Sequence, residues 1–164
     1  MSPTFDERGL DIVSHSVAQT QRLGARFGEL AQPGDLLCLE GELGSGKTCF
    51  VQGLGRGLGI VEPIHSPTFI LANEHRGPRL TLFHVDAYRL RGPDEAIGIG
   101  LEDYLSGDGV CVIEWAEKIA EALPADRMWI QFRHIDEGKR GLLIEACGAR
   151  YETMLRELRA SAFK

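Results

Sequence analysis

The sequence has little lysine and no concentrated positive charge. Four of its 164 residues are lysine, and 24 acidic residues outnumber the 18 lysines and arginines, which gives a formal net charge of −6. Strong binding of bare nucleic acid depends on clustered cations that neutralise phosphates. The chain is therefore not expected to capture nucleic acid alone, and any role on RNA would require a basic partner.

Long apolar runs and cysteine pairs are also missing. No run approaches the length that spans a bilayer, and the first ten residues contain charged side chains in place of an apolar core, so we expect neither a membrane protein nor a signal peptide. A chain of this length suits a single domain, residues 1–164. The scattered cysteines form no Cys-x-x-Cys pair and are expected to be reduced in a cytosolic protein: Cys38, Cys49, Cys111 and Cys147.

Residues 41–48, Gly-Glu-Leu-Gly-Ser-Gly-Lys-Thr, match the phosphate-binding loop (P-loop) pattern G-x-x-x-x-G-K-[ST] at every fixed position. Glycines let the backbone turn tightly and aim N–H groups at phosphate oxygens. Lys47 brings positive charge to the β- and γ-phosphates, and Thr48 offers a hydroxyl to Mg²⁺ where a helix begins. An apolar, strand-like run precedes the loop and a helix-like run, 48–58, follows it. This context predicts a nucleotide-phosphate site rather than an incidental glycine-rich turn.

The remaining pattern predicts parallel strands beside antiparallel ones. Residues 110–113 are an uninterrupted apolar run, typical of a central strand buried on both faces. Two hairpins are expected, one from strands 68–73 and 80–85 around the loop 74–78, and one from strands 128–134 and 141–146. Helices are expected over 16–30, 94–97, 101–105 and near the C-terminus. The predicted fold class is α/β: a P-loop NTPase, a three-layer sandwich with a mixed, mainly parallel central sheet and antiparallel hairpins.

Three glycines interrupt the helix expected after the P-loop. Gly53, Gly55 and Gly57 are costly in a helix because glycine loses the most backbone freedom on folding. We expect these residues to pack closely against the sheet.

Hydrolysis requires more than a P-loop, because metal ligands and a group that positions water are also needed. Asp86 ends the apolar run 82–85, and Glu114 ends the run 110–113. Open α/β sheets bind ligands at the carboxyl ends of their strands. We therefore expect both carboxylates at the phosphate site, with Glu114 resembling the metal-holding residue of P-loop proteins. The alternative for each is a solvated carboxylate at a strand end.

Several other residues each allow two interpretations, one functional and one structural. Residues 66–68, Ser-Pro-Thr, lie where P-loop NTPases place a segment that senses the γ-phosphate, but a plain proline turn fits the spacing equally well. Trp115 is either a core residue or part of the site wall. Arg89 could meet phosphate or an acidic partner, although a solvated arginine is slightly favoured. The five histidines, His84 among them, show no metal-ligand spacing and are treated as structural or surface residues.

Four stretches in order resemble the motif set of the TsaE (YjeE) family, the small ATPases of bacterial tRNA threonylcarbamoyladenosine (t6A) synthesis. They are Gly41–Thr48, Ser66–Phe69, His84–Leu90 (His-Val-Asp-Ala-Tyr-Arg-Leu) and Ile113–Trp115 (Ile-Glu-Trp). The P-loop is generic, whereas the last two stretches are much more specific. The resemblance covers residues from about 16 to 123, and Arg140 extends it.

The resemblance implies roles for individual residues. Thr48 would ligate Mg²⁺, Glu114 would be the second metal ligand or act through its water shell, and Asp86 would lie near the γ-phosphate and be needed for hydrolysis. Arg140 would contact the nucleotide, by stacking on its base. With Lys47 and Asp86 as the catalytic pair, the expected ATP-binding set is Gly41, Gly44, Ser45, Gly46, Lys47, Thr48, Cys49, Asp86 and Arg140. Two departures are small: Glu42 where the family often has Asp, and Cys49 where it often has Thr.

The resemblance also implies partners. In this family a weak, Mg²⁺-dependent ATPase acts with two proteins, TsaD and TsaB, in transferring a threonylcarbamoyl group to adenosine 37 of tRNAs that read codons beginning with adenine (ANN). Contact with tRNA would be indirect, through the complex, in the cytoplasm and without a membrane. The alternative is a small-molecule P-loop kinase, which would need an acceptor pocket and usually an arginine-rich lid. A GTP-dependent switch is disfavoured because the guanine-reading Asn/Thr-Lys-x-Asp motif is missing.

Overall fold

The structure is a computed structural model that describes residues 8–68 and 71–162. Three expectations fall partly outside these residues: the lack of a leader at the N-terminus, the strand over 68–73, and Phe69 of the second motif. The described elements, in chain order, are β1 (Gly9–Ser14), α1 (Val17–Leu30), β2 (Leu36–Glu40), α2 (Lys47–Gly57), β3 (Ala72–Arg76), β4 (Thr81–Asp86), α3 (Pro93–Gly98), α4 (Leu101–Leu105), β5 (Val110–Glu114), the 3₁₀ turns η1 (Ala116–Lys118) and η2 (Ala120–Ala122), β6 (Arg127–Asp136), β7 (Lys139–Cys147) and α5 (Ala149–Ala162).

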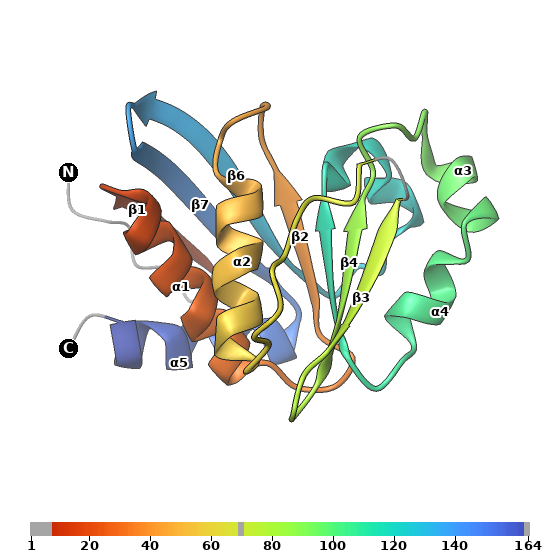
Figure 1. Ribbon diagram of the computed structural model, residues 1–164, viewed down its shortest axis with the longest axis horizontal. Helices are drawn as coiled ribbons and strands as arrows, with labels where there is room; N and C mark the ends of the chain where they lie inside the picture. Colours follow the sequence, from red (N-terminus) through yellow and green to blue (C-terminus); the bar gives the residue numbers. More distant parts are fainter. Residues whose placement is uncertain (1–7, 69–70, 163–164) are drawn as a thin grey trace.

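The seven strands of the described chain form one sheet in the order β1-β7-β6-β2-β5-β4-β3 (Figure 1). Parallel pairing joins β6 to β2, β2 to β5 and β5 to β4, so the four central strands point the same way. Antiparallel pairs complete the two sides of the sheet: β1 with β7, β7 with β6, and β3 with β4. This mixed sheet confirms the predicted fold class and leaves the P-loop strand β2 in the middle.

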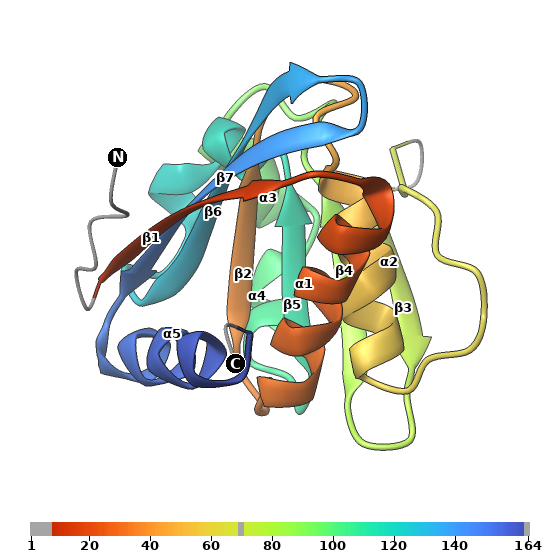
Figure 2. The same ribbon diagram turned by 90° about the vertical axis from the view of Figure 1, so that its left-hand side faces the viewer.

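Helices cover both faces of the sheet, so the fold has three layers, with the sheet between two layers of helices (Figures 1 and 2). α1, α2 and α5 lie on one face, and α3, α4 and the 3₁₀ turns lie on the other. Each face has its own apolar cluster. Among the helices of the described residues, none is long and apolar enough to cross a membrane.

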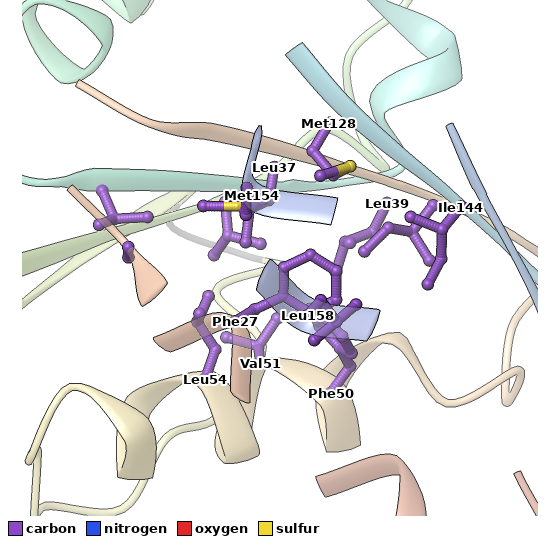
Figure 3. Packing of buried hydrophobic residues seen from close by; sticks show 14 of the residues in the cluster. Phe27, Leu37, Leu39, Phe50, Val51, Leu54, Met128, Ile144, Met154 and Leu158 are labelled. Atoms are coloured by element: carbon purple, nitrogen blue, oxygen red, sulfur yellow. The ribbon is translucent and has the colours of Figure 1, made fainter. Parts of the chain in front are cut away.

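The larger cluster joins the sheet to α1, α2 and α5, as the packing in Figure 3 shows. Leu37 and Leu39 of β2 point into it, whereas Cys38 belongs to the cluster on the opposite face. The rings of Phe27 and Phe50 meet at its centre with their centroids 5.4 Å apart. Burying one such side chain contributes about 1.5–3 kcal/mol. Burial on both faces accounts for the uninterrupted apolar sequence of β2.

α1 and α2 approach so closely that glycine is needed at the crossing. A Cβ atom on Gly53 would lie 1.9 Å from the carbonyl oxygen of Gln21, and one on Gly57 would lie 2.1 Å from that of Ala25. Close packing was therefore the right expectation, but the sheet was the wrong partner. Gly53 and Gly57 pack on the backbone of α1, and Gly55 packs on the loop that follows α2.

The β3–β4 hairpin exists, but its expected boundaries are wrong. Pairing begins at Ala72 and continues to Arg76, which lies opposite Thr81, so the residues expected as the loop 74–78 are mostly strand. These polar residues form a strand because β3 lies at the edge of the sheet, where most of its side chains can face solvent. His75 points inward instead: it is 8% exposed, and its Nδ1 is hydrogen-bonded to Glu62 at 2.8 Å. The second expected hairpin is confirmed as β6–β7.

Candidate nucleotide-binding site

The P-loop joins the carboxyl end of β2 to the first turn of α2. β2 is buried along four of its five residues, which fixes the start of the loop at the centre of the sheet. Gly44 and Gly46 have φ angles of 76° and 106°, in the left-handed region where a side chain is disfavoured. Since α2 begins directly after Gly46, its unpaired N–H groups face the loop, which is the arrangement that binds anions.

Lys47 folds back over the loop. Its Nζ donates to the carbonyl oxygen of Gly41 and, at 3.1 Å, to that of Glu42, and it lies 3.9 Å from the centre of the Trp115 ring. Lys47 is 5% exposed. Burial lowers its pKa, and three nearby carboxylates oppose that shift, those of Glu114, Glu117 and Asp86. The groups that hold the ammonium directly are uncharged, so a phosphate would be a stronger partner.

Thr48 and Glu114 meet at the other side of the loop. Thr48 Oγ1 donates a hydrogen bond of 3.0 Å to Oε1 of Glu114, which is 2% exposed at the end of β5. The second oxygen, Oε2, lies 2.6 Å from Nε2 of His84 on β4. Two donors from different elements therefore hold one buried carboxylate, with Oε1 directed toward the P-loop helix.

Asp86 lies beside Glu114, since the two residues are paired in the β4–β5 register. Its Oδ2 accepts hydrogen bonds from Ser66 Oγ at 2.5 Å and Thr68 Oγ1 at 3.0 Å. Its Oδ1 accepts from the backbone N–H of Tyr88 at 2.8 Å. Residues 66–68 are thus tied through their side chains to a strand end at the site, which a plain proline turn would not require.

These groups line a single cleft of roughly 470 Å³. Arg140, at the start of β7, lies along the P-loop: its Nη2 donates to the carbonyl oxygen of Gly44 at 3.1 Å, and its side chain passes over Gly46. Other lining residues come from the loop, the start of α2 and the segments after β4 and β5, namely Leu43, Ser45, Cys49, Tyr88, Arg89 and Trp115.

The donor set of the cleft fits a nucleotide phosphate and Mg²⁺. Ser45 Oγ is buried without a hydrogen-bond partner in the described part of the chain, so it is available to a phosphate oxygen. Thr48 and Glu114 supply oxygen atoms, and Mg²⁺ usually binds one or two such side chains together with phosphates and water. Within residues 8–68 and 71–162 no group of three or more His, Cys, Asp or Glu could hold a metal. The set therefore fits a metal bound jointly with a nucleotide better than a closed protein cage.

Most residues predicted for the site lie together at this cleft. Gly41 lies at the start of the loop, under the Lys47 ammonium. Trp115 lines the cleft, which is one of the two alternatives that the sequence left open for it. The roles of all these residues in binding a ligand remain predictions. The predicted residues that line the cleft directly are Gly44, Ser45, Gly46, Lys47, Thr48, Cys49, Asp86, Glu114 and Arg140.

His84 is the residue at the site whose contact sequence reasoning missed. The lack of metal-ligand spacing among the histidines gave no reason to connect it with Glu114. A signal was present, however, because residues two apart in a strand share one face. His84 stands two positions before Asp86 in an otherwise apolar run, so it lies on the same face of β4.

The strand–loop–helix unit and the carboxylates at the ends of β4 and β5 place this chain in the class of P-loop NTPase folds. The model of the family described as threonylcarbamoyl adenosine biosynthesis protein TsaE matches residues 14–142. The chain therefore belongs to the TsaE family, as its motifs indicated.

Individual relatives agree with this assignment. A protein from Bacillus subtilis (strain 168) is 41% identical over 140 residues, covering 85% of this chain and 87% of the relative. One from Treponema pallidum (strain Nichols) is 45% identical over 132 residues, covering 80% and 97%. Both are named tRNA threonylcarbamoyladenosine biosynthesis protein TsaE. The crystal structure of B. subtilis YdiB matches with a TM-score of 0.83 at 35% identity, covering 94% of this chain and 97% of that one.

Proposed function

We propose that this protein binds Mg²⁺ and ATP in the cleft and hydrolyses ATP slowly, as a subunit required for threonylcarbamoyl modification of adenosine 37 in tRNAs that read ANN codons. The observation that carries the proposal is the convergence of Lys47, Thr48, Asp86 and Glu114 on one cleft. Family membership supports the biosynthetic part, since the relatives are named for threonylcarbamoyladenosine biosynthesis.

Phosphate binding would use the loop and the first turn of α2. Backbone N–H groups of residues 44–49 face the anion, and the ammonium of Lys47 exchanges the carbonyl oxygens of Gly41 and Glu42 for phosphate oxygens. Arg140 already lies along the loop and would contact the nucleotide, by stacking of its guanidinium plane on the base. These contacts are largely blind to the base, so we expect only a modest preference for ATP over GTP.

Hydrolysis would use the two strand-end carboxylates. When bound, Mg²⁺ supplies positive charge that stabilises the phosphate oxygens, and Thr48 and Glu114 would hold it. Asp86 would orient the attacking water from the neighbouring strand end. Because Ser66 and Thr68 donate to the same oxygen of Asp86, residues 66–68 would respond when that carboxylate engages water. This arrangement allows the segment to sense the state of the γ-phosphate.

The ATPase would be weak alone and would depend on partners of the TsaD and TsaB type. The net charge of −6 disfavours direct capture of tRNA, so contact with tRNA would pass through the complex in the cytoplasm. The segment around Ser66 and Thr68 and the loop from Asp86 to Arg89 border the cleft, where a bound partner would affect the nucleotide.

The decisive experiment is reconstitution with purified TsaD and TsaB proteins, tRNA, ATP and a threonylcarbamoyl donor, followed by nucleoside mass spectrometry. We expect repeated turnover with the wild-type chain, loss of it with Lys47→Ala or Asp86→Ala, and ATP-dependent binding to the partners. Repeated turnover with the chain omitted, or with Lys47→Ala in its place, would refute the proposed role. Hydrolysis in the absence of any acceptor separates the ATPase from a small-molecule kinase.

A further inference from the structure

We infer that His84 is a positioning residue for the proposed metal site: it holds Glu114 in the orientation in which that carboxylate meets Thr48. The inference rests on the proposed Mg²⁺-ATP function and concerns a residue to which that function gives no part. His84 does not line the cleft, so any effect it has on a bound ligand must pass through Glu114.

The strand register explains how the two side chains meet. His84 lies opposite Val112, and Asp86 lies opposite Glu114, in the parallel β4–β5 pair. Paired residues, and residues two further along each strand, share one face of a sheet. Val112 belongs to the apolar cluster under α2, so His84 and Glu114 also lie on the face that α2 covers. Thr48 reaches Glu114 from the first turn of that helix, and His84 reaches it from the neighbouring strand.

Burial makes the contact necessary. An ionised carboxylate that is 2% exposed is strongly unfavourable unless donors replace its lost water. Thr48 supplies one donor to Oε1, but the same hydroxyl oxygen is also the group proposed to face the metal. The Nε2–H of His84 is a second donor, at 2.6 Å from Oε2, and its bond does not compete with a ligand. His84 is fully buried, so packing also restricts where the ring can move.

The other ring nitrogen shows that the imidazole is not there for packing alone. Nδ1 of His84 is buried and has no hydrogen-bond partner among the described residues. An apolar side chain of similar size would fill the same space without leaving a buried nitrogen unpaired. The bond to Glu114 is therefore what the imidazole adds. Outer-shell groups of this kind orient metal ligands in proteins and affect metal affinity about 10- to 100-fold.

The test compares three variants, His84→Leu, His84→Asn and His84→Gln, with the wild-type chain. The measured quantities are the Mg²⁺ concentration at half-maximal binding of a fluorescent ATP analogue, nucleotide affinity with EDTA, and the thermal unfolding midpoint. We expect His84→Leu to raise the half-saturating Mg²⁺ concentration about tenfold or more and to leave affinity in EDTA unchanged. His84→Gln should stay within about threefold of wild type, because its amide nitrogen can reach the position of Nε2, whereas the shorter Asn cannot.

His75 offers a matched control. It is also a buried histidine that bonds a carboxylate, Glu62, at 2.8 Å, but it lies on β3 away from the cleft. His75→Leu should lower the unfolding midpoint and leave the Mg²⁺ curve in place. In a Glu114→Gln background, His84→Leu should add no further shift, since it acts only through that carboxylate.

Three results would overturn the inference. The first is a folded His84→Leu chain whose Mg²⁺ curve superimposes on that of a Mg²⁺-dependent wild type. The second, decisive even if the Leu variant does not fold, is the same half-saturating Mg²⁺ concentration for the Gln and Asn variants. The third is a full additional shift in the Glu114→Gln background. A wild-type chain that binds nucleotide equally well without Mg²⁺ would instead refute the metal part of the proposed function, and this inference with it.

Discussion

α2 has two contrasting environments along its length. At its N-terminus, Lys47 and Thr48 are held by polar partners drawn from the P-loop and from β5. Further along the helix, Gly53 and Gly57 pack directly against the carbonyl groups of α1. The hydrogen bonds of the first environment are ones that a bound ligand could replace. The second environment consists of contacts between two backbones, for which there is no alternative partner.

The difference predicts that the two ends of this helix contribute separately to stability and to the proposed ligand binding. The polar end keeps charges in low-dielectric surroundings, which favours ligand binding more than folding. The glycine-containing part fixes how closely the helix packs on α1, whereas the polar end is held separately by the P-loop and by β5. Substitutions at the two ends should therefore fail in different assays.

The largest effect should come from Lys47→Ala. Without the ammonium, phosphate charge is uncompensated, and we expect the affinity for ATP to fall about 1,000-fold or more, equivalent to about 4 kcal/mol. The free energy of unfolding should change by less than about 1 kcal/mol, because burial already disfavours the charged form of this lysine. Calorimetric titration and chemical denaturation measure the two quantities, with the exposed Lys139→Ala as control. Wild-type affinity in the Lys47 variant would refute the phosphate site.

Gly53→Ala should show the opposite pattern. The added Cβ would lie 1.9 Å from a main-chain oxygen, so the helices must move apart, and we expect a loss of about 3 kcal/mol in the free energy of unfolding. Where the variant remains folded, its affinity for ATP should stay near that of wild type. Gly98→Ala is the control: nothing lies within 4 Å of its added Cβ, and the unfolding midpoint should be unchanged or slightly higher. Equal midpoints for the two variants would remove the contrast between the two parts of α2.

Asp86→Ala, at the end of β4 beside the polar end of α2, should separate ATP binding from ATP hydrolysis. The carboxylate has no phosphate-binding role of its own, so ATP affinity should change little, while the hydrolysis rate should fall about 100-fold. Ser66 and Thr68 lose their shared acceptor, so exchange of the amide hydrogens of these two residues should become faster. A fully active variant would assign Asp86 to structure alone.

The smallest effect concerns the cysteines. Burial raises the pKa of Cys38 to about 12 and also raises the pKa of Cys111, so their thiolates are negligible at pH 8 and thiol reagents should not modify them in the folded chain. Cys49 lines the cleft and should react. In a Cys147→Ser background, Mg²⁺ and ATP should slow that reaction several-fold. An unchanged rate at saturating ATP would indicate that the nucleotide lies elsewhere.

Much of this site is predictable because its chemistry is local in sequence. The P-loop is a contiguous pattern, and Asp86 and Glu114 are found by asking which residues end apolar strands. These signals need only the period of a strand and the position of its carboxyl end. The neighbouring strands then bring the residues together without further information.

The contacts that were not predictable depend on which elements become neighbours. Glycines in a helix signal a close approach, but nothing local states that the approaching backbone is α1 and not the sheet. The bond from His84 to Glu114 requires β4 to lie beside β5, in a definite register. The polar residues of β3 resemble a loop until His75 is seen to point inward, toward Glu62.

The central position of β2 sets an order of events during synthesis. Both strands that flank it, β5 and β6, are made at least 70 residues later, and Arg140 of β7 then bonds the P-loop itself. Pairings between such distant segments form late because a large loop must close first. A nascent chain therefore contains the whole P-loop sequence long before the loop can adopt its folded conformation. We therefore expect nucleotide binding, the function proposed above, to appear on the ribosome only after β6 and β7 have emerged.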